Sequence, residues 1–399
     1  MGKEAFTRFF NKRSAQLAAV ALLSILTLVF LLQTYHKASR PMGFDLTSYL
    51  ESARALFHGE NPYRTGSAFP YIYPMFLALL LIPLTLVPYW FSVTIWYVVG
   101  VLSLALMLRF LADVWGFSHE LKWGSHLYLP SAALCILLTP IIQNNLLNGQ
   151  ANFLVVLLCV LFLHSYVKRK PALAALFLAL AISIKIIPGI LLVFLAVRRD
   201  WRTLAMTAGL TALLCLAPWI FLRDQTWSIY AEYFRSTLIG SLNVPSVSNG
   251  SPVFFSLAGL VSYLAPAASD WPWLKPVSLL IVLAATVWLD LRACRRGLAG
   301  DTLAFASYLL AGLLILPITE THHLALMIPA LFLVMLAFLG GARLTTSQGM
   351  AMTLGPCIAV LLGTSFKRGP FLFLAVASLF AFVVWIRNRE SATVPQEPA

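Results

Sequence analysis

The sequence predicts an all-α polytopic membrane protein. Of the 399 residues, 60% are hydrophobic and only 11% are charged, and the mean hydropathy is +0.84. These values are typical of integral membrane proteins and lie outside the range of soluble domains. We expect one membrane domain over residues 1–399, with roughly 11–13 transmembrane or re-entrant helices, because no segment between the apolar runs is long enough for a separate module.

The first membrane span is expected at residues 15–34, which have the length of about 20 apolar residues that a crossing helix needs. A basic segment precedes this run, as in a secretory signal. The apolar core is too long for such a signal, and no clear small-residue cleavage site follows it. We therefore interpret the run as an uncleaved span.

The net charge of +13 lies mostly in short basic clusters beside apolar runs. This is the pattern of cytoplasmic loops and does not indicate nucleic-acid binding. The clusters occur at residues 168–170, 198–202 and 292–296, and at Arg387 with Arg389. Charge therefore predicts a cytoplasmic N-terminus (1–14) and tail (388–399), and extracytoplasmic loops at 35–70 and 223–250.

A lysine interrupts the apolar stretch between the first two clusters, "PALAALFLALAISIKIIPGILLVFLAV". If both ends are cytoplasmic, the chain must enter the membrane and return, so we expect two short arms that meet near Lys185 and Pro188. A charged residue in such a run is a functional-site hypothesis. The alternative is a lysine that extends to the membrane interface.

Some other segments are harder to assign to membrane spans. Residues 130–150 fit either a re-entrant pair or one more crossing, and 251–265 fit a shallow helix. The topology of residues 113–150 and 251–275 therefore stays open. Spans near 302–319 and 323–340 would place Glu320, His322 and His323 outside.

The stretch "MGFDLTSYLESARALFHGENPY" (42–63) is unusually polar for this chain. From Leu46 onward, apolar residues recur at helical spacing, which predicts an extracytoplasmic amphipathic helix along the membrane surface. Its polar side would carry Ser48, Glu51, Ser52 and Arg54. Gly59 would end the helix, and the Asn-Pro-Tyr sequence at 61–63 would turn the chain back.

Asp45 stands immediately before this expected helix. Its carboxylate could cap the helix N-terminus, or it could act as a general base for an attacking hydroxyl. The two roles are compatible, because one oxygen can cap while the other faces substrate. Glu60, beside the turn, is the second candidate base.

Several short motifs follow one another along the chain. After Asp45 come "GENPY" and "FPYIYPMFLALLLIPLTLVP", then "NGQANFLVVLL" (148–158) and "LALAISIKIIPGILL" (178–192). "SVSNGSPVFF" (246–255) and "ETHHLALMIPAL" (320–331) complete the series. In this order, over roughly residues 40–335, they resemble glycosyltransferase family 87, which includes polyprenol-phosphate-mannose-dependent α-mannosyltransferases.

The resemblance implies a GT-C membrane fold, a polyprenyl-phosphate-linked hexose donor, mannose above all, and a glycolipid or glycan acceptor. It also implies a multi-pass protein of a bacterial inner membrane, with its active site on the outer side. Asp45 matches the catalytic base, and Lys185 with His322 or His323 matches positions that hold the donor phosphate. Further donor or acceptor contacts are expected from Glu60, Tyr63, Arg64, Asn148, Gln150, Asn152, Asn249 and Glu320.

The expected chemistry needs no cofactor. The sequence has no Asp-x-Asp pair and no glycine-rich phosphate loop, so a metal-diphosphate site for a nucleotide sugar is not indicated. Lys and His can stabilise a lipid phosphate as it leaves. One essential carboxylate favours a single inverting displacement, with a β-linked donor giving an α-linked product. The expected partners are the donor, the acceptor and membrane lipids, and no nucleic acid.

Two other functions compete with an enzyme. In a lipid or solute transporter or flippase, Lys185 and the histidines would line a translocation path. A non-catalytic scaffold would explain the apolar bulk but not the polar residues predicted on one side. The acid-bearing surface helix, which transport does not require, favours the enzyme.

Overall fold

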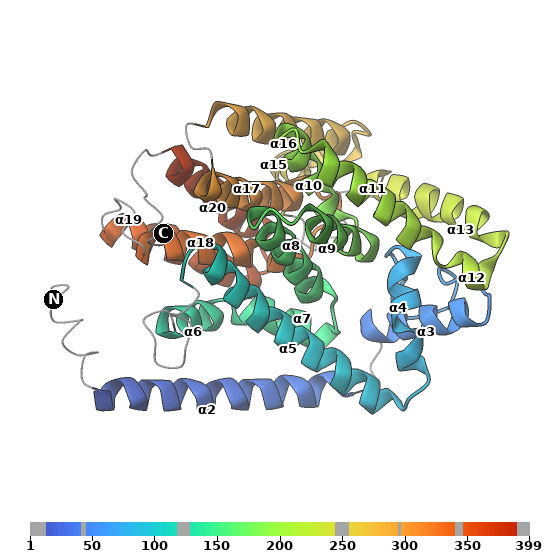
Figure 1. Cartoon of the computed structure of the whole chain (residues 1–399), viewed down its shortest axis with the longest axis horizontal. Helices are drawn as coiled ribbons and strands as arrows, with labels where there is room; N and C mark the ends of the chain where they lie inside the picture. The colour runs from blue at the N-terminus through green and yellow to red at the C-terminus, as the bar shows by residue number, and fades with distance from the viewer. Residues whose placement is uncertain are drawn as a thin grey trace.

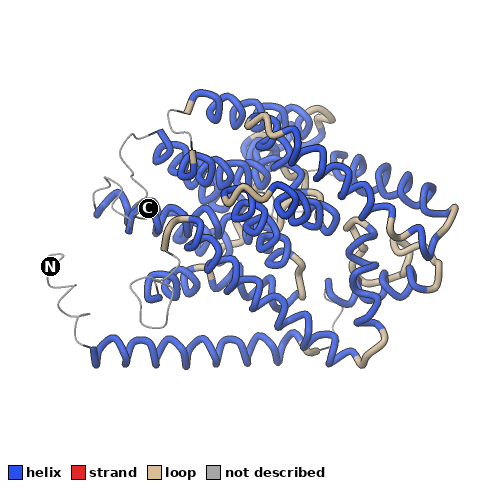
Figure 2. The backbone as a smooth tube through the Cα atoms, viewed as in Figure 1, coloured by secondary structure: helices blue, strands red, loops and turns tan. Residues whose placement is uncertain are grey.

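The computed structural model describes residues 13–40, 45–117, 128–243, 255–293, 297–339 and 346–388, and all regular structure in these ranges is helical (Figures 1 and 2). Within these ranges, seven helices are long and apolar enough to cross a membrane, or eight if the bent pair Thr139–Asn148 and Asn152–Val167 forms one span. The seven are Ala21–Ala38, Tyr89–Val114, Trp201–Leu222, Leu274–Arg292, Leu298–Ile315, Thr321–Leu339 and Gly369–Asn388. The predicted all-α, multi-pass architecture is therefore confirmed.

The first predicted span is helix α2 (Arg13–Ala38), which begins two residues before the predicted start and ends four residues after the predicted end. It lies along one edge of the molecule (Figure 1), and most of the side chains of residues 21–33 are exposed. An apolar helix with an exposed surface of this kind is suited to contact with lipid.

The centre of the molecule is built from α17 (Leu298–Ile315), the 3₁₀ helix η4 (Thr321–Met327) and α18 (Ile328–Leu339). Among the apolar spans, Leu298–Ile315 and Thr321–Leu339 are the most deeply buried. In the first, 78% of the residues are buried inside the protein, and in the second 89%. Around this core pack α5 (Tyr89–Val114), α8 (Asn152–Val167) and α20 (Gly369–Asn388).

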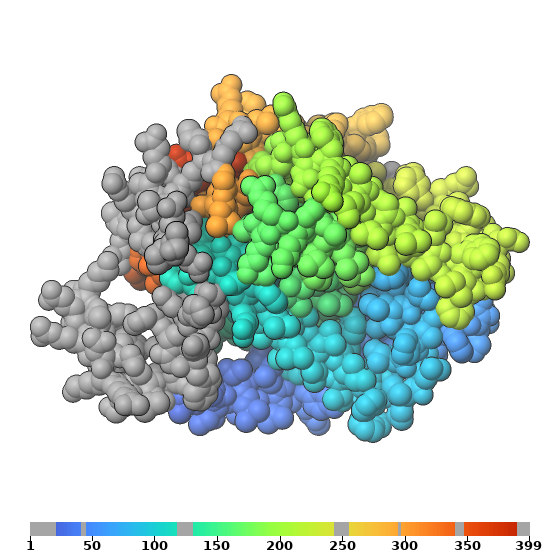
Figure 3. All heavy atoms as spheres, viewed as in Figure 1, coloured from blue at the N-terminus to red at the C-terminus, as the bar shows by residue number. Residues whose placement is uncertain are grey.

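More exposed helices surround this centre. Helix α11 (Trp201–Leu216) continues into α12 (Trp219–Leu222) and α13 (Gln225–Tyr233), which form part of the outer surface (yellow-green in Figure 3). The remaining outer and connecting elements are α6 (Tyr128–Leu137), η2 (Phe234–Ile239), α14 (Gly240–Asn243), α15 (Leu257–Leu264), η3 (Pro266–Asp270), α16 (Leu274–Arg292) and α19 (Thr346–Ser365).

The two short arms predicted around Lys185 are present. Helix α9 (Pro171–Ile184) ends directly before Lys185, whose backbone is extended. The chain resumes through η1 (Ile187–Gly189) and α10 (Ile190–Val197). Pro188 lies in η1, where its fixed φ is compatible with the tight turn.

The open segment at 130–150 contains two ten-residue helices, α6 and α7 (Thr139–Asn148). Neither is long enough to cross a membrane alone. Helices α7 and α8 meet at a bend of 113°. The expected shallow helix at 251–265 corresponds to α15, which has eight residues.

The predicted surface helix is α3 (Asp45–Phe57), but its surroundings differ from the prediction. Ser48 and Ser52 are buried, Glu51 is half-buried, and Phe57 is exposed. The reason is tertiary: α3 packs against α4 (Met75–Thr85), and the returning chain covers its polar side, where the Ser52 hydroxyl donates to the Pro62 carbonyl at 2.8 Å. Gly59 does follow the helix, with φ of 75°.

Two of the arginines assigned to basic flanks are also less exposed than expected. Arg198 donates to Asp290 and to Asp301, each at 2.6 Å, and Arg387 pairs with the other oxygen of Asp290. These contacts join the end of α10 to α16, α17 and α20. We call this group the four-charge network. Its partners are far apart in sequence, so charge clustering alone gave no sign of them.

Candidate active site

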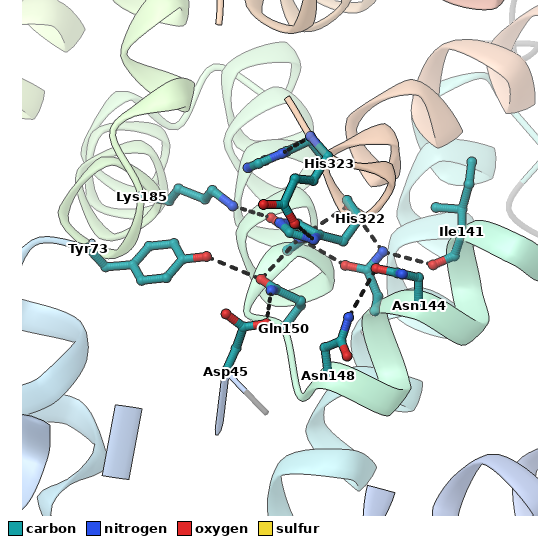
Figure 4. Close-up of polar contacts among 12 residues, drawn as sticks. Asp45, Tyr73, Ile141, Asn144, Asn148, Gln150, Lys185, His322 and His323 are labelled. Carbon is teal, nitrogen blue, oxygen red and sulfur yellow. Dashed lines mark hydrogen bonds and ion pairs between the residues drawn. The ribbon is translucent and has the colours of Figure 1, made fainter. Parts of the chain in front are cut away.

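The candidate site lies where four helices begin, bend or break. Asp45 opens α3, Gln150 occupies the corner between α7 and α8, Lys185 lies in the break after α9, and Glu320 precedes η4. Figure 4 shows Asp45, Gln150 and Lys185 directed toward one another, and Glu320 joins this group through its contact of 3.4 Å with His322. Irregular backbone at membrane depth is tolerated where it lines protein or water, and broken helices often supply polar sites there.

Asp45 is half-buried in the first turn of α3. A carboxylate at this position is stabilised by the positive end of the helix dipole. Its Oδ2 atom accepts a hydrogen bond of 2.5 Å from Gln150 Nε2. The other carboxylate oxygen points away from Gln150 (Figure 4). Asp45 thus belongs to the helix itself, with one oxygen held by a neutral donor.

Glycine makes the close approach of this corner to α3 possible. Gly149 has φ of 62°, and a Cβ atom there would lie 2.6 Å from the Leu46 Cβ. The left-handed conformation ends α7 without strain only for a residue lacking a side chain. Trp96 fixes the same corner by donating from Nε1 to the Gly149 carbonyl at 2.7 Å. Gln150 is thereby placed beside Asp45.

Lys185 is 6% exposed, and its Nζ donates to Asn152 Oδ1 at 2.7 Å. It also lies 5.0 Å from the centre of the Tyr73 ring, a cation–π distance. Within the described part of the chain, no carboxylate comes within ion-pair distance of this ammonium. Its neighbours are therefore a neutral amide and a ring, which compensate a buried charge only in part.

Asn152 connects Lys185 to the rest of the site. Its Nδ2 donates to Asn145 Oδ1 at 2.9 Å and to the His322 carbonyl at 3.2 Å. A longer contact of 3.5 Å reaches Gln150 Oε1. Asn145 also donates to the His322 carbonyl, at 3.1 Å. The corner between α7 and α8 is thus fastened to the start of η4.

The two histidines have different partners. His323 Nδ1 accepts from the Glu320 backbone N–H at 2.9 Å, so this ring caps η4. His322 Nδ1 lies 3.4 Å from Glu320 Oε2. The ring centres are 4.3 Å apart, and both rings are buried. Because His323 is engaged in capping, His322 is the better candidate for a ligand.

The remaining predicted residues lie outside this cluster. Glu60 is exposed beyond the far end of α3, a helix about 20 Å long. Arg64 is exposed and paired with Glu232 at 2.9 Å. Asn148 donates to Asn144 at 3.2 Å, and the Tyr63 ring stacks on Tyr233. Asn249 lies outside the described residues.

Three residues of the cluster were not predicted to be part of it. Tyr49 and Tyr73 both donate to Gln150 Oε1 at 3.2 Å, and Asn145 joins Asn152 to His322. In the sequence Tyr49 occupies one of the apolar positions of α3, and Tyr73 lies in the irregular segment before α4. A signal was present in "NNLLNGQAN", where four Asn and one Gln crowd into nine residues of an apolar chain.

The surroundings of Asp45 raise its pKa, which helps this carboxylate to accept a proton. Burial raises the pKa of Asp45 above its ordinary value, against the opposing effects of the Gln150 hydrogen bond and the Lys185 charge. A base with a raised pKa takes a proton more readily. No group of three His, Cys, Asp or Glu side chains in the described ranges could hold a metal ion, which leaves the expectation of no cofactor untested.

Comparison with known proteins identifies the family to which this chain is similar. The model for glycosyltransferase family 87 matches residues 71–319, more than half of the chain. Two curated relatives are named polyprenol-phosphate-mannose-dependent alpha-(1-2)-phosphatidylinositol mannoside mannosyltransferase. That of Mycolicibacterium smegmatis is 28% identical over 80% of this chain and 77% of its own. That of Mycobacterium tuberculosis is 27% identical over 79% and 75%.

Among solved structures, ArnT from Cupriavidus metallidurans, bound to undecaprenyl phosphate, matches with a TM-score of 0.45 and 15% identity. The match covers 93% of this chain and 77% of that one. The family model is the finding that decides between an enzyme and a transporter. With residues 71–319 matched, this multi-pass membrane protein belongs to glycosyltransferase family 87.

Proposed function

We propose that this membrane glycosyltransferase transfers a hexose, with mannose as the first candidate, from a polyprenyl-phosphate donor to a hydroxyl of a glycolipid or glycan acceptor. The names of the curated relatives support the donor and a glycolipid acceptor. The observation that carries the proposal is a half-buried carboxylate joined, through two amides, to a buried cation that has no carboxylate within ion-pair distance among the described residues.

In the proposed reaction the acceptor hydroxyl attacks the anomeric carbon and gives its proton to Asp45. The bond from that carbon to the phosphate oxygen breaks, and the polyprenyl phosphate leaves with the bonding electrons. The phosphate gains one negative charge, which Lys185 stabilises because it is fixed and desolvated. A single displacement inverts the anomeric centre, so a β-linked donor gives an α-linked product.

His322 assists at the phosphate in this proposal. Its ring adjoins Glu320, and its carbonyl is fixed by Asn145 and Asn152. The N-terminus of α8, which begins at Asn152, adds a positive helix end to the same place. The cation, the imidazole and the helix end together suit a phosphate, with no metal in the proposed step.

The proposal includes a site that faces the extracytoplasmic side of a bacterial inner membrane. Exposed basic residues at 168–170 and Arg199 follow the ends of α8 and α10 that are remote from Lys185. Basic loops mark the cytoplasmic side, so Lys185 and Asp45 belong to the opposite side. There a lipid-linked donor can lie in the membrane while the acceptor approaches from outside.

The test is sugar transfer by purified protein in detergent, from radiolabelled polyprenyl-phosphate-mannose to a mannosylated phosphatidylinositol. We expect Asp45→Asn to lower kcat about 10²- to 10⁴-fold, the usual contribution of a general base. Glu60→Gln is the comparison at the far end of α3. Activity retained by Asp45→Asn and lost by Glu60→Gln would transfer the base to Glu60. If the protein transfers only a different lipid-linked sugar, the proposed sugar is wrong but the proposed reaction stands.

A further inference from the structure

The side-chain amide of Gln150 contacts groups of two kinds. On one side, Nε2 donates to the Asp45 carboxylate at 2.5 Å. On the other, Oε1 accepts from the hydroxyls of Tyr49 and Tyr73, each at 3.2 Å. Gln150 is only 5% exposed, and both tyrosines are buried. An amide surrounded in this way has one favourable orientation, because a flip would turn its oxygen toward a carboxylate.

The tyrosines are themselves fixed. Their rings meet edge to face, with centres 5.1 Å apart. The Tyr73 ring also lies under Lys185. Tyr73 therefore contacts both the residue that holds the base and the cation proposed to hold the phosphate. A buried hydrogen-bond network of this kind favours one arrangement of its members.

This arrangement gives the two oxygens of Asp45 different roles. Oδ2 is occupied by Gln150, and Oδ1 points away from it (Figure 4). Because Gln150 holds Oδ2, a proton arriving from an acceptor hydroxyl would be taken by Oδ1, to which no described side chain donates. The Gln150 hydrogen bond favours the ionised carboxylate, which is the form that a general base needs.

We propose that Gln150 is a positioning residue, which Tyr49 and Tyr73 lock in the orientation that presents Oδ1 of Asp45 to the acceptor and keeps the carboxylate ionised. The proposal rests on the role of Asp45 as base. It assigns Gln150 no contact with substrate, unlike the donor or acceptor contact that the sequence suggested.

The test compares kcat, the KM for the donor and the pH profile in Gln150→Leu, Gln150→Glu and the double variant Tyr49→Phe with Tyr73→Phe. Gln150→Leu removes a hydrogen bond to a charged group, so we expect kcat to fall about 10- to 100-fold while the donor KM is unchanged. The acid limb of the profile should move to higher pH, because the ionised form loses a donor.

Gln150→Glu keeps the shape and places a second carboxylate beside the base. Like charges raise a pKa, so its acid limb should move further than that of Gln150→Leu. The phenylalanine pair should give a smaller shift, because the Tyr73 ring stays under Lys185. The other groups that act on Asp45 (Lys185, Glu320, Tyr49 and Tyr73) are unchanged in both Gln150 variants.

Gln143→Leu is the matched control, because it removes a glutamine from α7, the helix that leads into the corner. This variant should leave kcat, the donor KM and the pH profile unchanged. A lower kcat with an unshifted acid limb in both Gln150 variants would overturn the proposal. A raised donor KM at unchanged kcat would instead make Gln150 a substrate contact, which also overturns it. Failure of the base itself is detected separately, by activity of Asp45→Asn.

Discussion

Two buried charged regions of this protein differ in the groups that surround their charges. In the four-charge network, two arginines meet two aspartates, and Asp290 accepts in addition from the Tyr308 hydroxyl at 3.1 Å. At the candidate active site, Lys185 has an amide and an aromatic ring as its neighbours. Buried charges are normally paired. In the first region each cation is therefore paired with a carboxylate, although the buried Arg387 Nε has no hydrogen-bond partner among the described residues, whereas the second region suits an anion supplied by a ligand.

Structural and functional cations of this chain differ in what surrounds their charge. A cation whose charge is matched by carboxylates holds helices together. A buried cation without such a match costs stability and is retained for chemistry. Substitutions in the two regions should therefore affect different measurements.

The largest expected effect is on folding, in the four-charge network. Asp290→Ala leaves Arg387 buried without its carboxylate, and removing one partner of a buried pair costs about 3–5 kcal/mol. Unfolding in detergent, followed by intrinsic fluorescence, measures this loss. Arg292→Ala, on the same helix but exposed over Trp288, is the control and should lose about 1 kcal/mol or less. Equal losses in both variants would mean that the network is not a structural unit.

The next effect is on catalysis, at Lys185. Lys185→Met keeps the volume and removes the charge, so we expect kcat to fall about 10²- to 10³-fold while the free energy of unfolding is unchanged or higher. Lys275→Met tests another buried lysine, which donates to the Ser241 carbonyl at 2.8 Å, and should keep the wild-type rate. A Lys185→Met protein that unfolds easily but transfers sugar normally would reverse the assignment.

A smaller effect is expected from the corner that brings Gln150 to Asp45. Gly149→Ala forces a side chain into a left-handed conformation and against Leu46, which should cost about 1–3 kcal/mol and lower kcat. Gly209→Ala adds a methyl group within α11, where nothing lies within 4 Å. Alanine favours a helix, so that variant should be as stable as wild type or about 1 kcal/mol more stable. Similar behaviour of the two would show that the close approach is dispensable.

The smallest effect is a shift in pH dependence. The base must be ionised, so kcat/KM should rise with pH through the raised pKa of Asp45 and be lost as the pH falls below it. Replacing Lys185 by Met removes a charge that lowers this pKa, so the acid limb of the residual activity should move to higher pH. An unmoved limb would mean that Lys185 does not act on the base.

Local rules were sufficient for some of these features. The break at Lys185 followed from the short apolar stretch between two basic clusters and from Pro188, and Gly59 ended α3 as expected. Asp45 was identified from its place after the first span and from the family motifs. Each of these features depends on residues that are neighbours in sequence.

Other features depend on contacts across the fold. The polar side of α3 is covered because the returning chain places Pro62 over Ser52. Arg198 finds Asp290 and Asp301 on two other helices. The roles of Tyr49 and Tyr73 require the corner at Gln150 to reach α3. Periodicity and charge counts contain no information about such partners.

Under the proposed function, the anion that pairs with Lys185 is the donor phosphate, and among the described residues no carboxylate takes that place. The most direct measurement is the shift in Tm on adding polyprenyl phosphate to wild type and to Lys185→Met, with Lys275→Met as control. The account predicts a rise in Tm for wild type and Lys275→Met and little or none for Lys185→Met, because a ligand stabilises in proportion to its affinity for the folded state. The same rise in all three proteins would contradict it.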